Sequence, residues 1–285
     1  MLGTFGVFLA MLVPFPAAYV TMRHGVLDGV VIVVFTCAAL LAMEGMEAGV
    51  PYLLQFGVAS FVLPWLLQRR MAWDRAVAAA TLVAVAASLL FVVGAGIKSG
   101  QSIDAMVQVY VQGELDKALL VYKQARLPAE QLRELQALAN RTAEFLQLAY
   151  PALVTVGAGL LMLLTTSLLN HFARGRYLLA GIPFRLWKAP EMLVWLVILG
   201  GFGVFFGEGT LYQLAVNLLT LMLPIYFFQG LAVVAHYFHR KGVVPALRVI
   251  GYLLMVIANP LQVIVAGIGI FDLWVDFRKP RIKKS

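Results

Sequence analysis

The chain has 285 residues, of which 62% are hydrophobic and only 13% are charged, and its mean hydropathy is +0.88. Soluble domains carry roughly 25% charged residues, so this composition excludes a protein whose whole surface faces water and indicates one that lies in a lipid bilayer. The net charge of +8 is concentrated in short loops and the C-terminal tail, and without a nucleic-acid-binding motif beside it we expect no nucleic-acid partner.

Uncharged runs follow one another along the chain. They cover residues 1–22, 29–43, 48–68, 76–97, 145–173, 192–207, 209–239 and 249–271. A helix needs about 20 apolar residues to cross a bilayer, and backbone groups in lipid must be satisfied within each segment. We therefore predict an all-α fold, a polytopic transmembrane bundle of eight or nine helices. Residues 1–97 are its N-terminal and 149–277 its C-terminal transmembrane helices.

The segment 98–144 breaks this pattern, because it contains six basic and six acidic residues. Apolar residues recur at helical spacing over 102–125 and again after Pro128, which suits the first turn of a helix. We predict that residues 98–148 form one amphipathic helical hairpin outside the membrane. It is either a stalk that extends two spans or a cap over a substrate entrance.

The basic residues also predict the orientation. When the loops between successive uncharged runs are numbered along the chain, the first, third, fifth and seventh together carry eleven basic residues. The short loops around 44–47 and 207–209, which would lie on the opposite side, carry none. Basic loops stay in the cytoplasm, so we place the N-terminus outside and the basic tail 278–285 in the cytoplasm. If the chain starts outside and crosses the membrane eight times, however, its C-terminal tail ends outside. Either the segment 242–277 forms a hairpin at Asn259–Pro260, which we favour, or the first run does not cross.

Polar side chains interrupt the last two apolar runs. Asn217 and Thr220 share one helical face, as do Gln229 and His236. Such a stripe either lines a polar cavity or joins helices by hydrogen bonds. If the cavity binds a small molecule, we expect its ligands to be Asn217, Tyr226, Gln229, His236, Asn259 and Gln262.

The end of the last run carries a second group of candidates. Asp272, Trp274 and Arg278 are expected to fix the last helix at the cytoplasmic interface, where an aromatic ring and basic residues suit the lipid surface. The group acts either as a generic membrane anchor or as a docking site for a partner protein.

Catalytic patterns are missing from the sequence. The four histidines show no metal-ligand spacing, Cys37 is the single cysteine, and no HExxH, GxSxG or P-loop motif occurs. We therefore expect no enzyme activity, no metal and no cofactor.

Three stretches of the C-terminal half are distinctive together. They are PFRLWKAPEMLVW at 183–195, NLL at 217–219 followed by YFFQGLAVV at 226–234, and GIGIFDLWVDFR at 267–278. The combination resembles the bacterial YybS-like family of multi-pass membrane proteins over nearly the whole chain, most strongly after about Tyr150. The resemblance implies the bacterial plasma membrane and supplies no catalytic residues.

That family is in turn distantly similar to two groups of membrane proteins, and each implies a function. The substrate-binding subunits of energy-coupling-factor vitamin transporters imply a small-molecule capture subunit. Such a subunit needs a separate ATPase module, since this chain has no Walker motif. The envelope-morphogenesis protein MreD implies a non-transporting scaffold for cell-envelope proteins. From the sequence we favour the capture subunit.

The predicted orientation is testable by cysteine labelling in intact cells. A cysteine at Ser102 should react with a membrane-impermeant reagent and one at Ser285 should not, because the bilayer shields the cytoplasmic tail. Equal reaction at the two positions would contradict the topology.

Overall fold

The computed structural model describes residues 11–124, 129–172 and 179–279, and within these ranges it is helical and contains no strand. The all-α prediction is confirmed for this part of the chain. Contacts divide the chain into two compact units, an N-terminal unit that ends at Gly181 and a C-terminal unit that begins at Ile182. This division differs from the ranges expected from membrane topology, which stay a prediction.

The N-terminal unit begins with a series of apolar helices that reverse direction at tight turns. Gly25 and Gly45 occupy two of these turns with φ of +113° and +79°, conformations that favour glycine. The helices are α2 (Pro14–His24), α3 (Val26–Glu44), α4 (Met46–Pro51), the π-helix η1 (Tyr52–Gly57), α5 (Val58–Gln68) and α6 (Trp73–Ser99). Small and large side chains such as Ala18, Leu63, Ala80 and Met162 interlock in its core.

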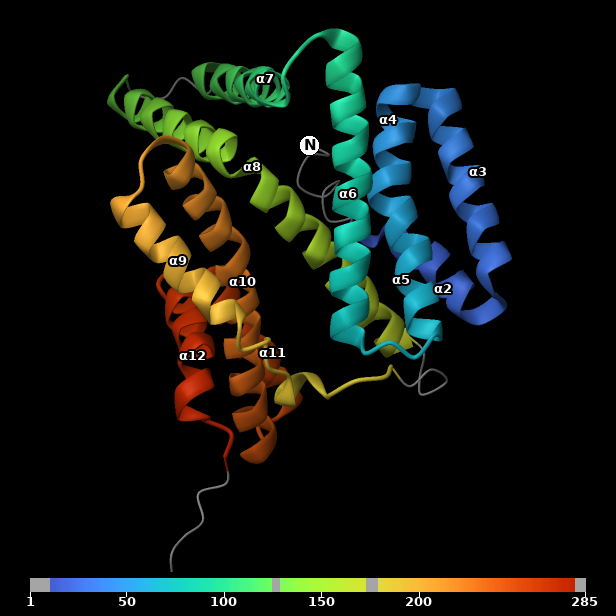
Figure 1. Cartoon of the computed structure of the whole chain (residues 1–285), viewed down its shortest axis with the longest axis vertical. Coiled ribbons are helices and arrows are strands. Elements are labelled where there is room, and N and C mark those ends of the chain that lie inside the picture. Colours follow the sequence, from blue (N-terminus) through green and yellow to red (C-terminus); the bar gives the residue numbers. More distant parts are fainter. Residues whose placement is uncertain (1–10, 125–128, 173–178, 280–285) are drawn as a thin grey trace, which may run out of the picture. The chain divides into compact units, whose positions relative to one another are not determined.

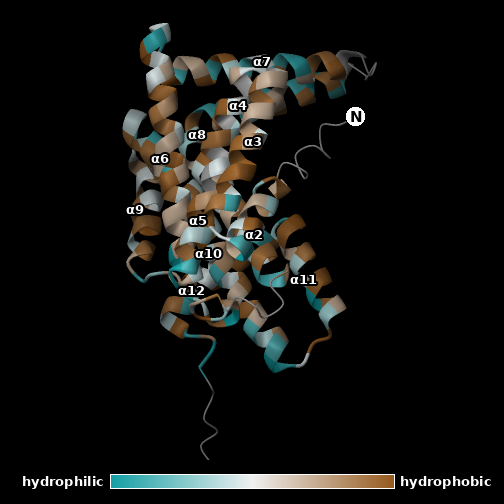
Figure 2. Cartoon of the chain, turned by 90° about the vertical axis from the view of Figure 1, so that its right-hand side faces the viewer, coloured by the Kyte–Doolittle hydropathy of each residue, from teal (hydrophilic) through white to brown (hydrophobic). Residues whose placement is uncertain are grey.

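The two helices predicted for the hairpin are present in the described residues and pack on each other, but the second is part of a longer helix. α7 (Ile103–Gln124) runs crosswise to α6 (Figures 1 and 2), and α8 begins at Ala129, close to the predicted start. However, α8 continues without interruption to Phe172, through Pro151. At 44 residues it is about 66 Å long, twice what a bilayer core requires. The second hairpin helix and the next membrane span are therefore one helix.

The C-terminal unit is built around one long helix. It contains the short 3-10 helix η2 (Phe184–Leu186), α9 (Leu193–Phe206), α10 (Gly209–Arg240), α11 (Pro245–Ile257) and α12 (Leu261–Val275). α10 packs against η2, α9 and α12 (Figure 1). A break does occur at Asn259–Pro260, but α11 and α12 meet there at 101° and are not the antiparallel pair expected of a hairpin.

Two glycines bring α10 and α12 into direct backbone contact. A Cβ atom on Gly230 would lie 1.9 Å from the carbonyl oxygen of Val265, and one on Gly269 would lie 1.9 Å from that of Tyr226. Only glycine leaves room for such a crossing, and small residues serve the same purpose between membrane helices in general.

The number of predicted spans is not confirmed. Four described helices are long and apolar enough to cross a membrane, and five if the bent pair counts as one span; they lie in 26–43, 73–99, 130–172, 209–240 and the pair 245–275. Uncharged length alone does not register where a helix bends or stops. The first predicted run lies partly outside the described residues, and α2, which overlaps its described part, has 11 residues.

Large apolar side chains face outward on several of these helices. Phe35 on α3 and Phe205 on the shorter apolar helix α9 are 75% and 86% exposed, and α3 is mostly apolar. In water such surfaces would be unstable, whereas the hydrocarbon of a bilayer accommodates them.

The glycine crossing predicts a sharp contrast within α12. Gly269→Ala should lower the stability of the C-terminal unit by about 2–3 kcal/mol, because the new methyl group meets a backbone oxygen that cannot move aside. Gly267→Ala is the matched control, since a Cβ there meets nothing within 4 Å. Thermal unfolding of the two purified variants in detergent measures the difference. Equal melting temperatures would contradict the crossing.

Candidate functional site

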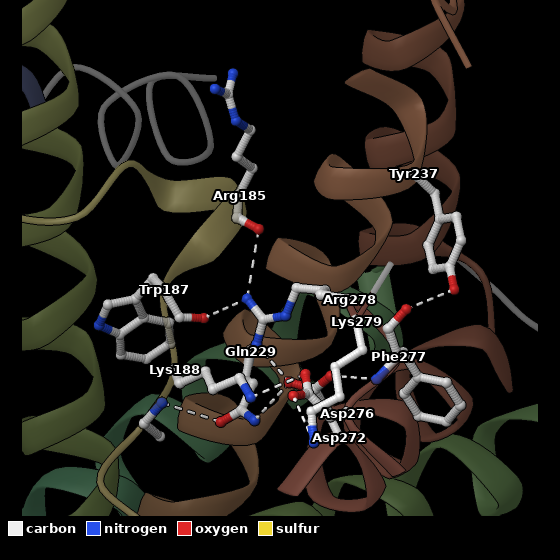
Figure 3. Close-up of polar contacts among 11 residues, drawn as sticks. Arg185, Trp187, Lys188, Gln229, Tyr237, Asp272, Asp276, Phe277, Arg278 and Lys279 are labelled. Atoms are coloured by element: carbon white, nitrogen blue, oxygen red, sulfur yellow. Dashed lines mark hydrogen bonds and ion pairs between the residues drawn. The ribbon is translucent and has the colours of Figure 1, made fainter. Parts of the chain in front are cut away.

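A buried carboxylate lies at the centre of the candidate site. Asp272 on α12 is completely shielded from solvent. Its Oδ2 accepts a hydrogen bond from Nε2 of Gln229 at 3.2 Å and pairs with the guanidinium of Arg278, while its Oδ1 accepts from the backbone N–H of Phe277 at 3.2 Å (Figure 3). A buried charge costs several kcal/mol unless it is paired and hydrogen-bonded, and these three donors meet that need.

Gln229 connects this carboxylate to a third segment. Its side chain is fully buried on α10, and its Oε1 accepts a hydrogen bond from the backbone N–H of Ala189 at 3.0 Å. Gln229 is therefore a bridge between the segment that follows η2 and the end of α12, with both ends of its amide in use.

Arg278 joins the chain that leaves α12 to the same segment. Asp276 adopts a left-handed conformation with φ of +45° directly after the helix, so the chain turns and Arg278 points back to Asp272. Nη1 of Arg278 then donates to the carbonyl oxygens of Trp187 at 2.9 Å and Arg185 at 3.4 Å. We call Gln229, Asp272 and Arg278 the buried cluster.

A second, more exposed set of charges surrounds Asp276. Its carboxylate lies 3.0 Å from Nζ of Lys188 and 3.5 Å from Nζ of Lys279. The hydrogen bond from Lys188 is the main cause that lowers the pKa of Asp276 below its usual range, against an opposing effect of burial. These pairs therefore stabilise the fold at neutral pH, and the contribution is lost as the pH falls through the lowered pKa.

The residues predicted to bind a substrate lie in several different environments. Gln229 belongs to the buried cluster, and Tyr226, one turn earlier, is fully buried beside the glycine crossing with no hydrogen-bond partner for its hydroxyl among the described residues. Nδ2 of Asn217 donates to the carbonyl oxygen of Gln213, on its own helix, at 2.9 Å. The His236 ring is 5.9 Å from that of Tyr237 and at right angles to it.

The two candidates near the helix break have separate surroundings. Asn259 is exposed, and Gln262 donates from Nε2 to the carbonyl oxygen of Val256, which belongs to the last turn of α11. That contact links α12 to α11 across the bend. Of the six predicted ligands, Gln229 belongs to the buried cluster, and the substrate role of the set stays a prediction.

The predicted docking residues divide in a similar way. Asp272 and Arg278 form the ion pair of the buried cluster, whereas Trp274 is 61% exposed and lies near Phe271 on the outer face of α12. Sequence reasoning assigned Gln229 to one role and Asp272 to another, although each is a polar group in an apolar run and so needs a partner. The role of the 185–189 backbone was missed, because almost every residue has the same backbone carbonyl and N–H groups and no residue type identifies the ones that form these bonds.

Most polar atoms of the buried cluster bond to other groups of the protein. The carboxylate and the amide are occupied by protein donors and acceptors, and only Nε of Arg278 has no partner in the described part of the chain. No three His, Cys, Asp or Glu side chains within residues 11–124, 129–172 and 179–279 lie together as metal ligands would.

Two Asp→Asn substitutions test the importance of the buried charge. Asp272→Asn should destabilise the protein by about 3–5 kcal/mol, because Arg278 stays buried without a counter-charge. Asp276→Asn should cost at most about 1 kcal/mol, since its ion pairs are partly exposed and asparagine also tolerates the left-handed backbone. Chemical or thermal unfolding of both purified variants provides the comparison. A cost for Asp276→Asn as large as that for Asp272→Asn would contradict the assignment.

Comparison with known proteins identifies a family. Residues 1–273 match a family model described as "Predicted membrane protein (DUF2232)". Searches of curated proteins and of solved structures gave no match. The finer resemblances to YybS-like proteins, vitamin-transporter subunits and MreD stay predictions. The match agrees with the apolar helices described above, and because it extends over nearly the whole chain, the chain belongs to the DUF2232 family of predicted membrane proteins.

Proposed function

We propose that this membrane protein is a non-transporting scaffold that holds partner proteins of the bacterial cell envelope at the plasma membrane. One observation carries the proposal: the charged and amide groups buried in the C-terminal unit are engaged in fastening the chain to itself. Groups that bind a transported solute should instead have free donors or acceptors that face a cavity. The proposal assigns the chain no catalytic step and no cofactor.

The partner is expected to bind an amphipathic arm, which we define as α7 with the first part of α8. α7 packs on α8, and Oη of Tyr150 donates to the carboxylate of Asp104 at 3.1 Å. Away from this contact the arm exposes Val109, Tyr110, Leu120 and Val121 among its charged residues, and Figure 2 shows both hydrophilic and hydrophobic residues along α7. Apolar side chains exposed beside charges are typical of protein-binding surfaces.

The proposed orientation places the arm outside the cytoplasm. Within the N-terminal unit, the last turn of α2 carries Arg23 and the turn after α5 carries Arg69 and Arg70, while the turn at Gly45 carries no basic residue. Basic turns remain on the cytoplasmic side. The arm follows the opposite end of α6, so partners would meet it on the outer face, with the N-terminus outside and the C-terminus in the cytoplasm.

A small-molecule capture subunit that works with an ATPase module is the second candidate. The hydroxyl of Tyr226 favours it, because this group is buried in the C-terminal unit without a partner in the described residues. A buried hydroxyl normally finds a hydrogen bond, and a bound polar molecule would supply one.

Site-specific photocrosslinking in intact cells tests the scaffold. A photoreactive amino acid at Val109 should give a discrete protein adduct, because the side chain is exposed on the arm. The matched control is Leu199, which is similarly exposed but lies on the apolar helix α9, where lipid is the expected neighbour. Adducts at both positions, or at neither, would contradict binding through the arm.

Native mass spectrometry of the purified protein separates the two candidates. The scaffold predicts no co-purified small molecule other than membrane lipid. A capture subunit predicts a retained molecule that is lost in Tyr226→Phe while the melting temperature is unchanged. That result, together with no adduct at Val109, would replace the scaffold by the capture subunit.

A further inference from the structure

The C-terminal unit carries a pocket that none of the functions above uses. It has a volume of about 400 Å³ and lies where the end of α10 meets the chain that follows α12. Its lining residues are Tyr237, Arg240, Lys241, Phe277 and Lys279. Three of the five side chains are cationic, two are aromatic, and none is acidic.

The cations of this pocket are poorly neutralised by the protein. Arg240 and Lys241 are exposed and form no ion pair with any described residue. Lys279 lies 3.5 Å from the carboxylate of Asp276, which is closer to Lys188 at 3.0 Å. Three positive groups that converge from two segments attract an anion, and they repel one another when the pocket is empty.

Backbone and aromatic contacts hold the walls in place. Oη of Tyr237 donates to the carbonyl oxygen of Phe277 at 2.8 Å and so fastens the two segments together. The N–H of Lys241 donates to the carbonyl oxygen of Tyr237 at 2.9 Å, and the N–H of Lys279 to that of Asp276 at 3.1 Å. Arg278, between two lining residues, is held in the buried cluster. The cations therefore project from fixed backbone, which reduces the entropy lost on binding.

The neighbouring helix indicates where the anion comes from. α11 begins four residues after Lys241 and lies at 101° to α12. Its side chains Leu247, Ile250 and Leu254 are exposed, and Tyr252 rests on Phe238 of α10 with ring centroids 5.6 Å apart. An apolar helix that leaves the bundle at a wide angle beside basic residues is suited to the membrane interface. A ligand with both an anionic head and acyl chains matches this pair of surfaces.

We propose that this pocket binds the phosphate of an anionic phospholipid headgroup. The guanidinium of Arg240 and the ammonium groups of Lys241 and Lys279 contact the phosphate oxygens, as such groups do in other phosphate sites. The acyl chains lie along α11. The bound lipid fixes the end of α10 at the cytoplasmic surface of the bilayer.

Lipid titration of the full-length protein, monitored by native mass spectrometry, tests this site. Phosphatidylglycerol should bind more tightly than the zwitterionic phosphatidylcholine, and Arg240→Gln/Lys241→Gln should weaken phosphatidylglycerol binding about 25-fold, or roughly fivefold for each charge removed. Lys279→Gln should weaken it about fivefold. The matched control is Lys98→Gln/Arg133→Gln, which removes two exposed positive charges from the N-terminal unit and should leave the affinity unchanged.

Three outcomes would overturn the proposal. An equal loss in the control variant would mean that the lipid responds to net charge and not to the pocket. Phosphatidylcholine binding as tightly as phosphatidylglycerol would exclude recognition of a net anionic headgroup. If inorganic phosphate alone binds as tightly as the lipid and with the same dependence on Arg240, the ligand is a free anion. None of these results depends on the amphipathic arm, so the lipid site and the scaffold function are tested independently.

Discussion

The carboxylate of Asp272 lies wholly inside the C-terminal unit, where water cannot stabilise its charge. Moving an ion of this size from water into a protein interior costs several kcal/mol, so donors must replace the lost hydration. They come from α10 through Gln229, from the chain after α12 through Phe277 and Arg278, and indirectly from the segment after η2, whose backbone holds both Gln229 and Arg278. One buried charge thus determines the relative positions of three segments distant in sequence.

The same arrangement depends on how closely two helices approach. Gln229 can reach Asp272 because Gly230 and Gly269 let α10 and α12 touch through their backbones. Between helices in a membrane, close packing and hydrogen bonds provide much of the attraction, since lipid is as apolar as the side chains. The glycine crossing and the buried cluster therefore support each other: the first provides proximity, and the second provides a polar bond that fixes the register.

The polar groups of the protein are of two kinds: buried groups that bond to one another and maintain the fold, and exposed groups that are available to partners. Inside the C-terminal unit, the cluster residues are bonded to one another. On the surface, Tyr110 of the arm is 71% exposed, and Arg240 and Lys241 lack counter-charges among the described residues. The arm presents apolar groups beside charges, which suits a protein, whereas the basic pocket presents cations beside an apolar helix, which suits an anionic lipid. The two proposals thus rest on different chemistry.

The sequence by itself determined that this is a helical membrane protein. Its uncharged runs are long enough to cross a bilayer as helices, and its charged residues are too few to form a surface that faces water. It also placed a helix start after Pro128 and a break at Asn259–Pro260, since proline lacks the N–H that a continuous helix needs. It did not determine the number of spans, because an uncharged run shows neither that α8 continues far beyond the length of a bilayer core nor that α11 and α12 form a bent pair. Only the tertiary structure decided that Gln229 and Asp272, 43 residues apart, share one cluster with Arg278. That pairing follows from a backbone crossing in three dimensions and from carbonyl acceptors at positions 185 and 187, which every amino acid provides and no sequence pattern distinguishes.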